Sequence, residues 1–179
     1  ELFARNKDGT RNVRMFCYSS PKTLNYLLKG CERVWDKSGR ASWVTSTCVT
    51  VSPGDEAVRC SCPACRKTFT QAGGHWVDGG SLIMATFVQR MCEAVKRRWP
   101  GKKVIYLPYW NYDTPCPEVN YPDNLVIMSA MTTYPMPLKA QRGNFEDAIQ
   151  RVRDFRAQTS FPVTTWDYSV AWTYGPYQY

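Results

Sequence analysis

Segments rich in β-branched and aromatic residues alternate along this chain with amphipathic helical segments, and this alternation constrains the fold more than any other feature. The clearest helix is predicted over residues 81–99, which Ser81 can cap and which Pro100 and Gly101 terminate. Its apolar stripe consists of Leu82, Ile83, Phe87, Val88, Met91, Cys92 and Val95. Strands that alternate with such helices favour an α/β fold with a parallel sheet.

The remaining elements suggest a single domain over residues 1–179. Two further helices are predicted, one from Pro21 to Trp35 and one from Asn144 to about residue 157. Strands are predicted at residues 13–18, 42–52, 103–109, 125–131 and 163–168. A long cysteine- and glycine-rich connection, residues 57–80, is predicted as an inserted loop. This order fits either an open doubly wound sheet or an incomplete eight-stranded barrel.

Charge and composition narrow the partners that suit the chain. The net charge of +8 would attract polyanions, and the 14% of aromatic residues would stack on sugars or bases. The basic residues are dispersed, however, and the densest run, Lys96 to Arg98, ends a predicted helix where cations are favourable. Nucleic acid is therefore the less favoured partner. No apolar run is long enough to cross a membrane, and the abrupt start at Glu1 indicates a piece of a longer protein.

Acidic and aromatic side chains gather where the predicted strands end, which is where parallel α/β folds carry their chemistry. Asp55 and Glu56 directly follow the second strand, and Asp167 lies near the end of the last one. Adjacent carboxylates suit acid/base catalysis, because a neighbouring like charge raises one pKa. The simpler alternatives are a Pro-Gly turn with solvated acids and an aspartate bonded to backbone amides. Platforms for stacking on a sugar are predicted at Tyr109, Trp110, Tyr112, Trp166 and Tyr168.

Three closely spaced cysteines, Cys60, Cys62 and Cys65, form a compact thiol cluster. With a fourth ligand they would make a tetrahedral structural zinc site, and His75 is the only histidine that could complete it. A disulfide within the trio and reduced thiols are the alternatives, as is an exposed His75 without a ligand role. The other five cysteines mostly lie in apolar stretches, where free cysteine packs as a small hydrophobe: Cys17, Cys31, Cys48, Cys92 and Cys116.

A strand that ends in Ser52-Pro53-Gly54-Asp55 is followed by the cysteine trio and then by a helix with Phe87-Val88 and Ala94-Val95. In these motifs the sequence resembles the bacterial family described as domain of unknown function 4838, over nearly the whole chain. The resemblance implies a relation to (β/α)₈-barrel glycoside hydrolases, close to α-glucuronidases and β-N-acetylhexosaminidases. It further implies that the chain covers about the third to seventh barrel strands of a secreted or periplasmic protein.

The resemblance also suggests roles for the acidic pair. Asp55 matches the acidic position of the family, whereas Glu56 stands where the family usually has glycine. The run Pro53-Gly54-Asp55-Glu56 looks like the Gly-Gly-Asp-Glu of hexosaminidases, in which the glutamate is the general acid and the aspartate orients the substrate. The histidine that commonly precedes that motif is missing here.

Two functional hypotheses follow. The first is a glycoside hydrolase, or part of one, that acts on an oligo- or polysaccharide through Asp55, Glu56 and Asp167 and needs no cofactor for catalysis. The second is a non-catalytic module that binds carbohydrate or nucleic acid and has a cysteine-stapled loop.

Overall fold

Four parallel strands form the central sheet, and they follow one another in chain order. They are β3 (Cys48–Val51), β4 (Lys103–Tyr106), β5 (Leu125–Met131) and β6 (Val163–Asp167). The computed structural model describes the backbone of residues 2–131 and 138–167, and the side chains of residues 2–130 and 146–166. The predicted α/β fold with a parallel sheet is confirmed. The order of these strands contains no reversal of the kind that defines a doubly wound sheet.

The two faces of this sheet differ in burial. Val49 pairs with Val104 and Val104 with Leu125, and all three side chains are buried. Because side chains alternate along a strand, the intervening residues point to the opposite face. That face consists of Cys48, Thr50, Ile105, Val126, Met128, Ala130, Thr164 and Trp166, all of them half-buried or exposed except the buried Ala130. One face therefore carries the core and the other remains open in the described part of the chain.

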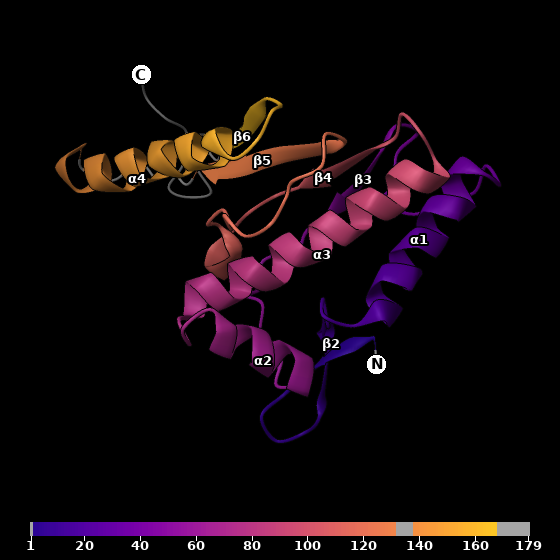
Figure 1. The fold of residues 1–179 in the computed structure, drawn as a ribbon, viewed down its shortest axis with the longest axis horizontal. Coiled ribbons are helices and arrows are strands. Elements are labelled where there is room, and N and C mark those ends of the chain that lie inside the picture. The colour runs from indigo at the N-terminus through magenta and orange to yellow at the C-terminus, as the bar shows by residue number, and fades with distance from the viewer. Residues whose placement is uncertain (1, 132–137, 168–179) are drawn as a thin grey trace, which may run out of the picture.

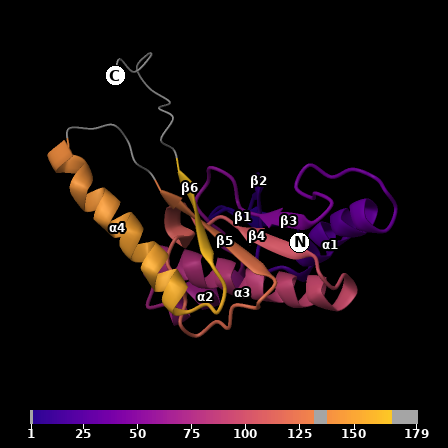
Figure 2. The ribbon, with the colours of Figure 1, turned by 90° about the horizontal axis from the view of Figure 1, so that it is seen from above.

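Helices cover the buried face. Figure 1 shows α3 (Trp76–Arg98) running along the sheet, with α1 (Pro21–Trp35) beside it and α2 (Pro63–Gln71) across its first turns. Figure 2 shows α4 (Leu138–Ala157) beside β5 and β6, which it contacts. Between β4 and β5 the connection contains only a short 3₁₀ turn, η1 (Trp110–Tyr112). None of the helices in the described part of the chain has the length and apolar character that a membrane crossing needs.

A separate antiparallel pair, β1 (Phe3–Arg5) and β2 (Arg11–Phe16), precedes the sheet. The sequence predicted a strand at residues 13–18, but not its pairing with the first residues of the chain. The predicted strand at residues 42–52 is also shorter than expected. Only Cys48–Val51 is strand, because residues 43–45 fold back along its edge and Val44 forms an isolated bridge to Val49.

The prediction of a loop at residues 57–80 is wrong. This segment contains α2 and the first turn of α3, which begins at Trp76 rather than at Ser81. Ser81 lies inside α3, buried, and its hydroxyl accepts a hydrogen bond from the backbone N–H of Thr114 at 3.2 Å. Similarly, α4 begins at Leu138 and not at Asn144. Both helices extend beyond the residues that the sequence identified as caps.

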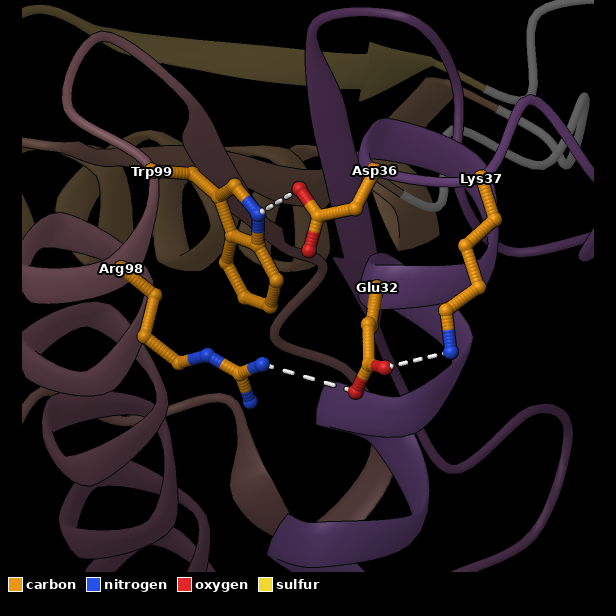
Figure 3. Close-up of polar contacts among 5 residues, drawn as sticks. All are labelled: Glu32, Asp36, Lys37, Arg98 and Trp99. Atoms are coloured by element: carbon orange, nitrogen blue, oxygen red, sulfur yellow. Dashed lines mark hydrogen bonds and ion pairs between the residues drawn. The ribbon is translucent and has the colours of Figure 1, made fainter.

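The last turns of α1 and α3 are joined by polar contacts (Figure 3). The Trp99 indole donates a 2.6 Å hydrogen bond to the carboxylate of Asp36. Glu32 forms ion pairs with Lys37 at 2.7 Å and with Arg98 at 3.4 Å. Two of these contacts, Trp99–Asp36 and Arg98–Glu32, connect residues more than 60 positions apart and link the ends of the two helices.

Candidate metal centre

The start of α2 holds two of the clustered sulfur atoms in place. Cys62 is the N-cap residue of this helix and Pro63 occupies its first turn, where a missing N–H costs no hydrogen bond. The sulfur of Cys62 accepts a 3.5 Å hydrogen bond from the backbone N–H of Cys65. Both residues thus lie at the N-terminal end of one helix, which fixes the two sulfur atoms relative to each other.

Cys17, which directly follows β2, supplies the fourth sulfur. Its Sγ lies 3.7 Å from that of Cys62, 3.8 Å from that of Cys65 and 3.7 Å from that of Cys60. All four sulfur atoms lie within 4.8 Å of one another and all four residues are buried. The chain therefore brings one cysteine from the N-terminal hairpin together with three from the segment that leads into α2.

These distances fit the geometry of a tetrahedral metal ion. Zinc–sulfur bonds of about 2.3 Å place the sulfur atoms of a tetrathiolate site roughly 3.8 Å apart. All eight cysteines of the chain are free thiols in the structure, so none of these four is engaged in a disulfide. The residues present therefore suit a closed four-sulfur site for a metal such as Zn²⁺.

Backbone and hydroxyl groups around the cluster orient its sulfur atoms. The N–H of Arg5 donates to Cys60 Sγ at 3.3 Å, and the N–H of Ser61 donates to the carbonyl of Arg5 at 2.7 Å. Cys65 donates a 3.1 Å hydrogen bond to the Ser19 hydroxyl. The hydrogen bond between Cys60 and Cys17 lowers the pKa of Cys60 below its ordinary value and raises that of Cys17 to about 12. Such supporting contacts are typical of metal sites.

The structure does not place His75 in this cluster. Its side chain is 78% exposed and its Nδ1 atom lies 3.2 Å from a carboxylate oxygen of Asp78. It is the N-cap residue of α3, and its side chain makes no capping hydrogen bond. The prediction of His75 as the fourth ligand is therefore wrong, because Cys17 occupies that place in the described part of the chain.

The predicted acidic pair lies in the turn after β3. Asp55 is exposed and follows Gly54, whose positive φ of 77° suits glycine. Glu56 is half-buried, and one of its carboxylate oxygens lies 3.5 Å from the side-chain amide of Asn12. The side chain of Asp167 lies outside the described residues, although its backbone ends β6.

The predicted aromatic platforms fall into different environments. Trp110 and Trp166 are 54% and 46% exposed, and Tyr109 is half-buried. Tyr112 is fully buried, and its hydroxyl donates to the backbone carbonyl of Gly54 at 3.1 Å. Tyr112 therefore belongs to the core and joins the loops after β3 and β4, rather than facing a ligand. Tyr168 lies outside the described residues.

Asp113, which the sequence analysis did not single out, is a third acid at this edge of the sheet. Its carboxylate is half-buried and lies 3.3 Å from Nε of Arg151 on α4. Burial raises the pKa of Asp113 above its ordinary value, although Arg151 opposes the shift. Only its position in the loop after β4 could have indicated it.

A buried asparagine, Asn111, holds the surrounding segments together. Its side-chain oxygen accepts from the N–H of Val58 at 2.7 Å, and its amide donates to the carbonyls of Val58 and Trp76 at 3.1 Å each. Gly80 on α3 lies directly against it, so that a Cβ atom there would overlap the backbone oxygen of Asn111. The amide thus joins the loops after β3 and β4 to the start of α3.

Comparisons with known proteins give a family but no function. Neither a curated protein nor a solved structure shows a significant match to this sequence. A family model described as a domain of unknown function, DUF4838, matches residues 1–177, and the chain belongs to that family.

Proposed function

We propose that Cys17, Cys60, Cys62 and Cys65 together hold one Zn²⁺ ion as a structural centre of this domain. The observation that carries the proposal is the convergence of four buried sulfur atoms within 4.8 Å of one another. A site with four protein ligands leaves no open position for substrate or water, so its role is to stabilise the fold. The ion would tie the β1–β2 hairpin to the start of α2, two parts of the chain that few other contacts join.

Metal content tests this proposal directly. Protein purified under reducing conditions, with zinc in the medium, is expected to carry one zinc per chain by native mass spectrometry and elemental analysis. Its denatured mass after alkylation should show all eight thiols once the zinc is removed. A metal-free protein with a disulfide among these four residues would contradict the proposal.

We further propose that the sheet is an arc of a (β/α)₈ barrel that belongs to a secreted or periplasmic glycoside hydrolase. The strictly sequential order of β3 to β6 supports this, since right-handed crossovers between consecutive strands keep the helices on one face. The half-exposed opposite face would then line the barrel interior. An open barrel wall of this kind needs further strands to complete it.

The strand-end loops supply the groups that such an enzyme needs. Tyr112 bonds to the carbonyl of Gly54, so Asp113 and Asp55, each the next residue along, lie on neighbouring loops at one edge of the sheet. Trp110 beside them is exposed and has a positive φ of 50°, a strained conformation of the kind that gathers at functional sites. In this proposal Asp113 acts as the acid, Asp55 is the second carboxylate, and Trp110 stacks on the sugar.

The hydrolase proposal is tested on the full-length protein with a panel of polysaccharides. Asp55→Asn and Asp113→Asn are each expected to lower turnover of the preferred glycan by at least about 100-fold, as removal of an acid/base group typically does. Asp147→Asn, an exposed position on α4, is the control and should not change turnover. Glycan binding without turnover in the unaltered protein would instead favour a non-catalytic carbohydrate-binding module.

A further inference from the structure

A separate concave site lies between the β1–β2 hairpin and the α2–α3 helices, and neither the sheet edge nor the metal centre accounts for it. The cleft has a volume of about 950 Å³. Four cationic side chains line it, together with Phe69 and Trp76: Arg5, Lys7, Arg59 and Arg66. Cys60 and Ser61 form part of its wall, so the cleft adjoins the four-sulfur cluster.

The positive charge of this cleft is not neutralised by the protein. No aspartate or glutamate lines it. Within the part of the chain that the structure describes, none of the four cations has a carboxylate partner at salt-bridge distance. The adjoining cluster does not balance them either. Four thiolates with one Zn²⁺ carry a net charge of about −2, so the four cations leave a surplus of positive charge when the ion is bound.

The cleft also presents an aromatic face beside these charges. Trp76 is 45% exposed, and the guanidinium of Arg59 lies 4.8 Å from the centre of its ring. The carbonyl of Trp76 accepts from the buried amide of Asn111, which fixes the start of α3 behind the ring. An arginine stacked on an indole keeps the N–H groups at its edge free to bind an oxyanion.

We propose that this cleft binds a small molecule that combines a ring with an oxyanion group, such as a carboxylate, sulfate or phosphate. A single arginine binds such an oxyanion through two parallel hydrogen bonds, and the ring of the ligand would lie against Trp76. The volume falls within the range of small-molecule sites, which favours a compact ligand over a polymer lying across the surface. Acidic sugars and nucleotides share this chemistry. The proposal does not depend on glycan hydrolysis.

Calorimetric titration of the zinc-loaded protein distinguishes an acidic sugar from a nucleotide as the ligand of the cleft. The probes are trigalacturonate for an acidic sugar, ADP for a nucleotide, and maltotriose as a neutral sugar, each at low salt. At least one charged probe is expected to bind at least about 10-fold more tightly than maltotriose, and the tighter of the two identifies the source. Equal binding of all three, or no binding of either charged probe, would overturn the proposal.

Matched variants separate a built site from general attraction to a basic protein. Arg66→Gln and Arg59→Gln each remove one exposed charge from the cleft and should weaken the charged probe by about 10-fold. Arg40→Gln removes one exposed charge elsewhere and should leave the affinity unchanged. Trp76→Ala should weaken the ring-bearing probe more than inorganic sulfate. If Arg40→Gln weakens binding as much as Arg66→Gln does, the cleft is not a specific site.

Discussion

The sulfur atoms of Cys17 and Cys60 lie 3.7 Å apart, although 43 positions separate the two residues in the sequence. The contact closes a loop that contains α1 and β3. An ion held at this point would remove much of the freedom of that loop in the unfolded chain, in addition to the free energy of its bonds to sulfur.

Replacement of Cys17 is expected to abolish zinc binding. Cys17→Ser removes one of four thiolates, and the loss of affinity should exceed the roughly 100-fold that removal of a supporting group causes. The zinc affinity is measured by titrating the protein with zinc in competition with a chromogenic chelator. Cys48→Ser is the matched control, because the Cys48 sulfur lies outside the cluster and bonds to the Thr45 hydroxyl at 3.1 Å, a partner that serine retains. His75→Ala should also keep full affinity, and zinc loss in that variant would restore the histidine as a ligand.

Trp99→Phe should lower the free energy of unfolding by roughly 2 kcal/mol, because the indole donates a 2.6 Å hydrogen bond to the Asp36 carboxylate. Urea denaturation of the zinc-loaded protein provides the measurement. Trp35→Phe is the comparison, since its indole donates at 2.7 Å to a neutral carbonyl, that of Thr45. We expect a cost of about 1 kcal/mol there. Equal costs in the two variants would show that the charge on Asp36 contributes nothing.

Gly80→Ala should destabilise the protein by about 2 kcal/mol, since the added methyl overlaps the backbone of Asn111 and a buried backbone cannot move aside cheaply. Gly30→Ala is the control. Its methyl would meet the edge of the Trp43 side chain, which is half-buried and can shift. Thermal unfolding of both variants tests the difference, and a fully stable Gly80→Ala variant would contradict the close packing of α3 on η1.

Glu32 should make stability depend on pH in acid. The hydrogen bond and charge of Lys37, followed by those of Arg98, lower the pKa of Glu32 from its ordinary value of 4.5. A carboxylate with a lowered pKa stabilises the folded state above its unfolded pKa, and this contribution is lost as pH falls through the folded pKa. The melting temperatures of the unaltered protein and Glu32→Gln should therefore differ slightly at pH 7 and converge as the pH falls through the lowered pKa of Glu32. Glu93→Gln, an exposed change on α3, should show no such convergence.

Periodicity predicted the parallel sheet and the buried stripe of α3, because both depend on local patterns of apolar residues. The helix starts were missed for a local reason. The glycines at 79 and 80 suggested a loop, yet both lie inside α3. Glycine is needed there because Phe69 packs where a side chain of residue 79 would be and Asn111 where one of residue 80 would be. Tyr112 was misassigned for a similar reason: an aromatic residue after a strand can face a ligand or join two loops, and only the tertiary structure decides.

The fourth ligand could not be predicted from spacing, because Cys17 lies far from the trio in sequence and sits in an apolar segment that also suits a packed thiol. The hairpin that carries Cys17 reaches the cluster through the pairing of β1 with β2 and through backbone bonds between Arg5 and the segment of Cys60. The three cysteines that the sequence singled out, Cys60, Cys62 and Cys65, are among the four whose sulfur atoms lie together, and metal binding there stays a prediction. The acids at the sheet edge stay predictions.

The side chain of Asn111 is shared between the loop after β3, the loop after β4 and the first turn of α3, where Trp76 lines the basic cleft. A buried amide with all of its partners fixed cannot release one segment without leaving polar groups unpaired. The cleft and the strand-end loops are therefore connected through the hydrogen bonds of this one side chain. A ligand in the cleft that restricts the motion of the start of α3 would also restrict the motion of Trp110 and Asp113, which flank this amide and its neighbour Tyr112. Binding in the cleft would thus be coupled to the strand-end loops without any rearrangement of the fold.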